Sequence, residues 1–186
     1  MTAYYIDIKI LSDAEFSHNI LLSSLYMKLH KYLFELKKNI GVSFPAFKKD
    51  LGNILRIHGS KDDLNCLMQL NWVGSLFSFL EFSEILEVPN STKYRIVSRV
   101  QNKSSVERLY RRSLRNNKIT KEEALIRLQK LKDLNYIRTP FIEMRSNSSR
   151  QRFKLFIEHG KVLDSPLEGN FSSYGLSNTA TIPWFL

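Results

Sequence analysis

Two stretches near the N-terminus decide the fold of the first half of the chain: YYIDIKIL, residues 4–11, and ILLSSLYMKLHKYLFEL, residues 20–36. In the first, isoleucines alternate with polar residues, which is the period of two of a strand with one buried face. In the second, leucines recur at the spacing of an amphipathic helix, with His30 beside the apolar stripe. The chain therefore opens with a strand and a long helix.

The alternation of strands and helices continues to residue 88. Further extended segments are expected at residues 40–44, 54–58 and 82–88. Ser60 with Asp63 three residues later indicates a helix start, and the apolar face of this helix continues to Leu76. The order strand, helix, strand, strand, helix, strand is typical of a ferredoxin-like split βαβ domain, a fold with many unrelated functions.

The second half begins with an alternating strand at residues 94–101. Two capping boxes, Ser104 with Glu107 and Thr120 with Glu123, predict two helix starts, and extended pieces follow at residues 141–144, 153–158 and 171–174. We therefore expect an α+β protein. Its ferredoxin-like domain covers residues 1–91, and a smaller α/β domain with an Arg-rich helix covers residues 92–186.

Charge is distributed unevenly along the 186 residues. The net charge of +10 comes from the second half, because residues 1–90 carry nine basic and ten acidic side chains. A basic half of this kind favours nucleic acid or an anionic surface as partner. The single cysteine, Cys66, favours a reducing compartment such as the cytoplasm. No apolar run approaches the roughly 20 residues of a membrane span, and we expect no membrane partner.

Four arginines of the first predicted C-terminal helix share one face: Arg108, Arg111, Arg112 and Arg115. Like charges on one stripe destabilise a helix unless a polyanion binds there. Arginine favours bidentate recognition of phosphate or guanine. By itself this helix leans towards the major groove of DNA, unless an RNA helix is short and opened by a loop or an end.

Other polar residues offer acid–base chemistry rather than metal chemistry. No histidine pair has metal spacing, no carboxylate cluster suggests a two-metal nuclease, and no Gly-rich phosphate loop is present, so we expect no metal and no cofactor. The loop RSNSSRQR, residues 145–152, suits phosphate contacts. Phe153 and Tyr174 are either core residues or ligand contacts, and Gly175 lets the backbone approach a ligand.

A set of short segments runs in a fixed order along the chain: LYMKLH ending at His30, IGVSFP, LRIH, YRIVSRVQ, the Arg-rich helix, LFIEHG and YGLS. In order and spacing they resemble the CRISPR repeat-specific endoribonuclease of subtype I-F systems. The resemblance runs nearly from end to end. It implies a ferredoxin-like N-terminal domain, and a C-terminal domain whose Arg-rich helix enters the major groove of the repeat hairpin RNA.

This resemblance also implies a reaction. The family cleaves the 3′ base of the hairpin without a metal, by attack of the substrate's own 2′-hydroxyl on the adjacent phosphate. The products carry a 2′,3′-cyclic or 3′-phosphate and a 5′-hydroxyl. His30 matches the catalytic histidine, Ser146 the serine that positions the ribose 2′-hydroxyl, and Tyr174 the tyrosine that orients the histidine.

The RNA-binding residues follow from the same resemblance. Arg99 and Gln101 match the pair that reads base edges near the foot of the stem, and Phe153 matches the aromatic that stacks under the terminal base pair. The groove arginines are Arg111, Arg112 and Arg115, with Arg108 on the same face. Where the family has a further phosphate-binding arginine this chain has Asn116, and whether Lys118 supplies that contact stays open.

Three functions remain in competition. The first is an endoribonuclease that cuts CRISPR repeat RNA and stays bound to the mature crRNA, beside other protein subunits of the surveillance complex. The second is a hairpin-binding subunit of a CRISPR effector complex without catalysis. The third is a DNA-binding regulator. The set of His30, Ser146 and Tyr174 favours the enzyme, and the role of His30 as base, acid or both is left open.

Overall fold

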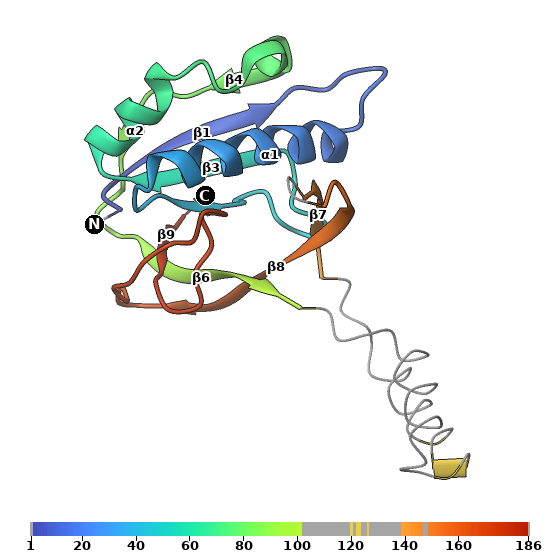
Figure 1. Cartoon of the computed structure of the whole chain (residues 1–186). Coiled ribbons are helices and arrows are strands. Elements are labelled where there is room, and N and C mark those ends of the chain that lie inside the picture. The colour runs from blue at the N-terminus through green and yellow to red at the C-terminus, as the bar shows by residue number, and fades with distance from the viewer. Residues whose placement is uncertain are drawn as a thin grey trace. The chain divides into compact units, whose positions relative to one another are not determined.

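The computed structural model describes residues 2–101, 120, 122–123, 126, 139–146 and 149–185. Residues 1–100 and 140–186 form one compact unit, and residues 101–139 form a second. In the described part of the first unit all paired strands are antiparallel and belong to two sheets (Figure 1). The protein is α+β, as predicted.

The first sheet is built from the N-terminal half. Its strands are β1 (Tyr4–Ile10), β2 (Gly41–Ser43), β3 (Ile54–Gly59), β4 (Leu80–Phe82) and β5 (Leu86–Glu87). The order is β2-β3-β1-β4, and β5 also pairs with β1. The isoleucines of β1 are buried, as their alternation predicts. This order is compatible with a ferredoxin-like arrangement.

Helix α1 (His18–Leu36) packs between the two sheets, because it contacts both β1 and β7 (Phe141–Arg145). Its buried face consists of Leu21, Leu22, Leu25, Tyr26, Leu29 and Leu33. The Ser23 hydroxyl accepts a hydrogen bond from the Glu143 amide at 3.2 Å, which joins the helix directly to the backbone of β7. The helix predicted from the leucine spacing is confirmed.

Helix α2 (Lys61–Gln69) begins as predicted and ends earlier than predicted. The Ser60 hydroxyl accepts from the Asp63 amide at 3.1 Å, which confirms the cap. The helix does not reach Leu76, because Leu70 is extended and the following residues turn Trp72 into the core, where it is 2% exposed. The 3₁₀ helix η1 (Gly74–Phe79) follows, and its first residue has a φ of +52°.

The second sheet has the order β7-β8-β6-β9. Its other strands are β6 (Lys93–Val100), β8 (Arg152–Leu163) and β9 (Ile182–Trp184). The side chains that this sheet buries, among them Val97, Ile142 and Leu155, belong to the same core cluster as those of β1 and α1. The two sheets therefore share one hydrophobic core.

The extended piece predicted at residues 171–174 is wrong. These residues lead into a turn in which the Gly175 amide donates to the Ser172 carbonyl at 2.8 Å, and Gly175 has a φ of +67°. The strand lies further on, at β9, where it pairs with the start of β6. Phe171 and Tyr174 pack against the core without forming a strand.

Few residues of the second unit are described. Thr120 and Glu123 form the predicted capping box, in which each backbone amide donates to the other side chain at 3.2 Å. Ser104, Glu107 and the four arginines of the predicted face lie outside the described residues. The domain boundary near residue 91 stays a prediction. Among the residues that the structure describes, none of the helices is long and apolar enough to cross a membrane.

Candidate active site

His30 lies in the C-terminal half of α1 and faces the turn at residues 172–175. Its Nδ1 is 2.8 Å from the carbonyl oxygen of Ser173. A carbonyl oxygen only accepts hydrogen bonds, so Nδ1 carries the proton and donates it. In the neutral ring the lone pair is therefore on Nε2. The backbone thus fixes Nδ1, and within the part of the chain that the structure describes Nε2 has no hydrogen-bond partner.

Tyr174, the next residue of the same turn, covers the face of this imidazole. The two rings are stacked, with centroids 4.0 Å apart and planes inclined by 3°. Because Ser173 binds the ring edge and Tyr174 covers the ring face, a single turn restrains both the direction and the tilt of His30. The structure thus brings together two of the three catalytic residues that the resemblance suggests.

Arg99 extends this group towards the second sheet. It is exposed on β6, and its guanidinium lies 5.7 Å from the ring centre of Tyr174 and 5.8 Å from that of Phe153 on β8. Both distances fall within the range of cation–π attraction. His30, Tyr174, Arg99 and Phe153 form a continuous group, which we call the His30 cluster.

Ser146 lies at the end of a strand that adjoins the His30 cluster, whereas Gln101 is the first residue of the second unit. Ser146 directly follows β7, where its amide donates to the Gln151 carbonyl at 2.9 Å and its hydroxyl accepts from the Ser149 amide at 3.2 Å. The pairing of Met144 with Phe153 places this hairpin end beside the Phe153 part of the sheet. Gln101 is exposed two residues after Arg99.

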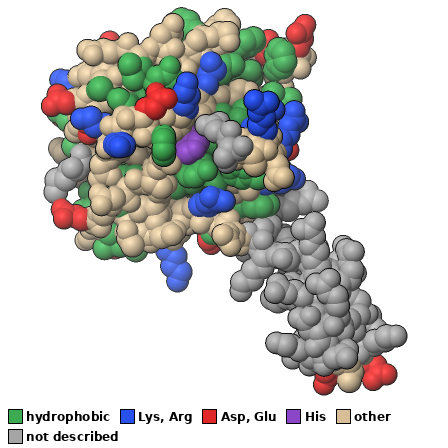
Figure 2. Space-filling model, in the orientation of Figure 1, with side chains coloured by type: hydrophobic (Ala, Val, Ile, Leu, Met, Phe, Trp, Pro, Cys, Tyr) green, Lys and Arg blue, Asp and Glu red, His purple; other side chains and the backbone are tan. Residues whose placement is uncertain are grey.

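The surroundings of the His30 cluster are basic. The second sheet and its hairpin carry seven exposed cations among the described residues: Lys93, Arg99, Arg145, Arg150, Arg152, Lys154 and Lys161. On the face drawn in Figure 2, Lys and Arg side chains lie among hydrophobic and other side chains. Such a surface suits an anionic ligand. Within the described residues no group of three or more His, Cys, Asp or Glu could hold a metal ion.

The remaining three histidines have other surroundings. His58 is fully buried with Nε2 2.8 Å from the Ser43 hydroxyl, and burial together with Arg56 lowers its pKa to about 3. His159 stacks on Phe47, and burial together with Arg95 lowers its pKa to about 4. Neither ring is poised to exchange protons near neutral pH.

His18, the fourth histidine, is partly buried and pairs with Asp50 at 3.1 Å at the start of α1. His18 is the first residue of α1 and lies more than three helical turns before His30, which separates it from the His30 cluster. His30 is thus the histidine that the described structure sets beside the other predicted site residues.

Sequence reasoning missed one contact of this site. The hydroxyl of Tyr26, one helical turn before His30, donates to the Tyr174 carbonyl at 2.6 Å. The spacing of Tyr26 and His30 was a usable signal, since side chains four residues apart lie on one helix face. Its target is a backbone carbonyl distant in sequence, which no side-chain pattern reveals.

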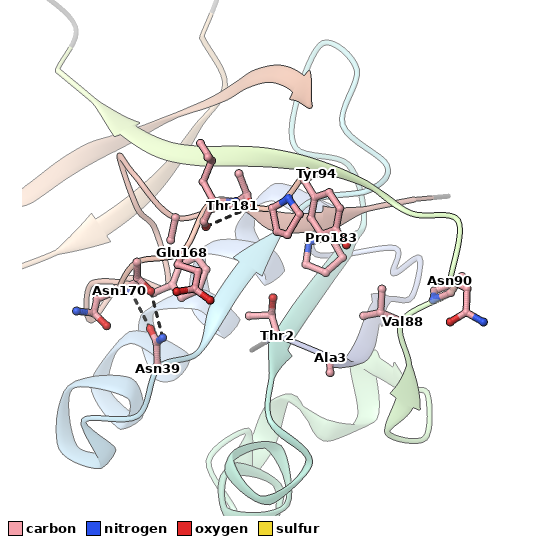
Figure 3. A pocket seen from close by; sticks show the side chains of 16 residues that line it. Thr2, Ala3, Asn39, Val88, Asn90, Tyr94, Glu168, Asn170, Thr181 and Pro183 are labelled. Carbon is pink, nitrogen blue, oxygen red and sulfur yellow. Dashed lines mark hydrogen bonds between the residues drawn. The ribbon is translucent and has the colours of Figure 1, made fainter. Parts of the chain in front are cut away.

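A pocket of about 620 Å³ lies apart from these residues, among the N-terminus, the segment before β6 and residues 166–171 (Figure 3). None of the predicted site residues lines it. At its edge the Asn39 side chain donates to the Gly169 carbonyl at 3.3 Å and accepts from the Phe171 amide at 3.0 Å. Asn39 therefore anchors the segment that leads into the turn at residues 172–175.

A restrained histidine thus lies beside an arginine and two aromatic rings, with further exposed arginines on the same sheet and hairpin. This geometry is compatible with acid–base chemistry on an anionic ligand. The model of one protein family, described as CRISPR-associated protein (Cas_Csy4), matches residues 5–185. This match covers nearly the whole chain, and the chain belongs to the Cas_Csy4 family.

Two curated relatives agree with this assignment. Both are named CRISPR-associated endonuclease Cas6/Csy4. The protein of Escherichia coli (strain UTI89 / UPEC) is 44% identical over 187 residues, and that of Pseudomonas aeruginosa (strain UCBPP-PA14) is 42% identical over 186 residues. Each alignment covers 98% of this chain and 99% of the relative. The family and the enzyme class predicted from the sequence, a CRISPR-associated endonuclease, are confirmed.

Proposed function

We propose that this chain is an endoribonuclease that cleaves CRISPR repeat hairpin RNA at the 3′ base of the stem without a metal ion. The observation that carries the proposal is the fixation of His30, whose Nδ1 is bound to the Ser173 carbonyl and whose face is covered by Tyr174. Membership of the Cas_Csy4 family supports the substrate. The N-terminal sheet with α1 and α2 would be a ferredoxin-like domain that carries His30.

In the proposed reaction the 2′-hydroxyl of the substrate attacks the adjacent phosphorus. The bond from phosphorus to the 5′-oxygen breaks, leaving a 2′,3′-cyclic phosphate and a 5′-hydroxyl. His30 accepts or donates a proton at Nε2. Its Nδ1 donates a hydrogen bond to the Ser173 carbonyl in both the neutral and the protonated ring, so the ring keeps the same orientation whether it acts as a base or as an acid. A positioned imidazole contributes about 10²- to 10⁴-fold.

The rest of the acceleration comes from alignment of the reacting groups. We assign Ser146 to the ribose 2′-hydroxyl, since it lies at the end of the β7–β8 hairpin that also carries the exposed arginines 145, 150 and 152. Holding the 2′-hydroxyl in line with the phosphorus requires contacts on both sides of the scissile phosphate. The His30 cluster and this hairpin are the two groups of residues proposed for that task.

RNA recognition is assigned to the basic second half. Arg99 and Gln101 read base edges at the foot of the stem, and Phe153 stacks under its terminal base pair. Arg108, Arg111, Arg112 and Arg115 enter the groove. After cleavage the protein stays on the mature crRNA as a subunit of the surveillance complex with other proteins, in the cytoplasm. A hairpin with a small loop offers the opened groove end that such a helix needs.

The test is incubation of the purified protein with a repeat-containing RNA in excess EDTA, followed by analysis of the product ends. We expect cleavage at the 3′ base of the stem, with a 2′,3′-cyclic or 3′-phosphate and a 5′-hydroxyl. The matched control substrate has hydrogen in place of the 2′-hydroxyl at the scissile nucleotide, and it should bind without being cut. Cleavage of that control would contradict the proposed nucleophile.

Two other results would replace the proposal. Tight hairpin binding without cutting, with and without added divalent metal, would make the chain a binding subunit. Duplex DNA that competes with the hairpin at equal salt would make it a DNA-binding protein, since affinities for nucleic acids are comparable only at one salt concentration.

A further inference from the structure

Two side chains of α1 bind consecutive carbonyls of the turn that holds Tyr174. His30 donates to the Ser173 carbonyl at 2.8 Å, and Tyr26 donates to the Tyr174 carbonyl at 2.6 Å. The two carbonyls belong to the peptide groups on either side of the Tyr174 Cα. Fixing both peptide planes fixes the backbone angles of Tyr174, and with them the direction in which its ring leaves the backbone.

The Tyr26 hydroxyl is built to remain a donor. Tyr26 is 1% exposed and its ring lies near that of Phe44, with centroids 6.1 Å apart. Burial, together with nearby Tyr174, raises the pKa of Tyr26 well above 10. The phenol therefore stays protonated across the pH range of an enzyme assay, and its buried oxygen has the partner that such a group requires.

On its other side the turn is held by β2. The Val42 amide donates to the Gly175 carbonyl at 2.9 Å. Gly175 has a φ of +67°, and a Cβ at this position would lie 2.7 Å from the Val42 Cγ1. The turn is thus fixed between α1 and β2, and little freedom is left for the two residues that touch His30.

We propose that Tyr26 is a positioning residue for RNA cleavage, because its hydrogen bond to the Tyr174 carbonyl holds the turn that orients His30. This inference rests on the proposed function of His30. Tyr26 does not touch the reacting atoms; it acts through Tyr174 and Ser173. A misplacement of about 1 Å in a reacting group can cost about 10²-fold in rate, so loosening this turn should slow the chemical step without weakening RNA binding.

The test is Tyr26→Phe, which removes only the hydroxyl. We expect the single-turnover cleavage rate of hairpin RNA in EDTA to fall about 10-fold, with the Kd for the hairpin unchanged. A second readout needs no activity: the ¹⁵N chemical shifts of the neutral His30 ring in the free protein. The wild type should show the proton on Nδ1, and in Tyr26→Phe a larger share should move to Nε2.

The matched control is Ser43→Ala, which also removes a buried hydroxyl, in this case the partner of His58 at 2.8 Å. Assayed well below the melting temperature of each variant, it should cleave at the wild-type rate with the wild-type His30 tautomer. If Ser43→Ala slows cleavage as much as Tyr26→Phe, the loss reflects general destabilisation and the inference is overturned.

Further outcomes separate this inference from the proposed function. Wild-type rate and unchanged tautomer in Tyr26→Phe would overturn the inference, and so would a slower rate with an unchanged tautomer. A wild-type protein that does not cut the RNA would overturn the proposed function. Comparison of the His30 tautomer in the wild type and in Tyr26→Phe would still test whether Tyr26 positions the histidine. If Tyr26→Phe does not fold, Gly175→Ala is used instead, because it displaces the same turn from the β2 side. It should lower the cleavage rate and shift the His30 tautomer towards Nε2. A wild-type rate and a wild-type tautomer in Gly175→Ala would refute the inference.

Discussion

His30 and Tyr174 lie ring against ring, with centroids 4.0 Å apart and planes inclined by 3°. One residue belongs to the first helix of the chain and the other to a turn near its end. The pair therefore forms only when the N-terminal and C-terminal parts of the first unit pack together. This arrangement makes the stacked ring, rather than the phenol oxygen, the part of Tyr174 that restrains the histidine.

The stack can be tested with two substitutions at Tyr174. Tyr174→Phe keeps the ring, so the single-turnover cleavage rate should stay within about threefold of wild type, whereas Tyr174→Ala should lower it by about 10- to 100-fold because His30 loses one of its two restraints. Rates are compared at saturating protein. Equal rates for Tyr174→Ala and wild type would show that the stack does not restrain His30.

Arg99 is expected to need its planar guanidinium, which lies near the rings of both Tyr174 and Phe153. Arg99→Lys keeps the charge and loses the fork and the flat face. The Kd for the repeat hairpin should rise about 10-fold, the magnitude of one lost bidentate base contact, and its salt dependence should stay unchanged. The measurement is fluorescence anisotropy over a series of salt concentrations.

The control for Arg99 is Lys93→Arg on the same strand. Lys93 is exposed at the far end of β6, where its ammonium binds the Asp164 carboxylate. Its replacement should leave the Kd within twofold of wild type, in keeping with the small effects of surface charges. If Arg99→Lys binds the hairpin as tightly as this control, Arg99 does not read base edges.

Two buried histidines should make the protein less stable in mild acid. The pKa is about 3 for His58 and about 4 for His159, below the ordinary value of about 6.5 that applies when the chain is unfolded. At a pH between the folded and the unfolded pKa, the unfolded chain binds more protons than the folded protein does. The free energy of unfolding is therefore at its full value above about pH 6.5 and decreases as the pH falls below it. The loss at about pH 5 is about 2 kcal/mol for each histidine.

The measurement is urea unfolding at about pH 7 and about pH 5. His159→Phe should roughly halve the loss, because His159 lies among the rings of Phe47, Phe44 and Trp184 and neither of its nitrogens has a hydrogen-bond partner in the described structure. His18→Gln, at a histidine whose side chain is 42% exposed, should leave the loss unchanged. Equal free energies of unfolding at both pH values would contradict this account.

A buried ion pair should matter for stability and not for catalysis. Arg56 is 5% exposed and donates to both carboxylate oxygens of Asp7, at 2.6 and 2.8 Å, and to the Phe185 carbonyl. Asp7→Asn leaves the guanidinium without its counter-charge and should lower the free energy of unfolding by about 3 kcal/mol. The cleavage rate of the folded protein should not change.

The surface pair of Lys9 with Glu81, at 3.3 Å and more than half exposed, is the control for Asp7. Lys9→Gln should change the free energy of unfolding by less than about 1 kcal/mol. If Asp7→Asn lowers the free energy of unfolding no more than Lys9→Gln does, the ion pair of Asp7 with Arg56 does not stabilise the fold.

Local patterns predict the regular elements of this chain well. The leucine spacing of α1, the alternation of β1 and the caps at Ser60 and Thr120 all correspond to observed contacts. The errors arise where tertiary contacts prevail. Burial of Trp72 ends α2 early, and β9 is a strand of three residues whose partner β6 begins almost 90 residues earlier, so it has no local period.

The sequence predicts which residues form the His30 cluster but not how they are arranged, and their roles stay a prediction. The resemblance supplies His30, Tyr174, Arg99 and Phe153, which the structure brings together. The bonds that orient His30 run to backbone carbonyls of Ser173 and Tyr174, and a carbonyl is the same in every residue type. Sequence alone therefore gives no sign of them, and the part played by Tyr26 emerges only from the fold.

The central claim is that His30 performs metal-independent cleavage of the repeat hairpin, and the most direct measurement compares wild type with His30→Ala. Both are incubated with hairpin RNA in excess EDTA, and the single-turnover rate and the hairpin Kd are measured. We predict that the wild type cleaves, while His30→Ala loses at least about 10²-fold in rate and keeps the wild-type Kd. Cleavage by His30→Ala at a rate close to wild type would contradict the account.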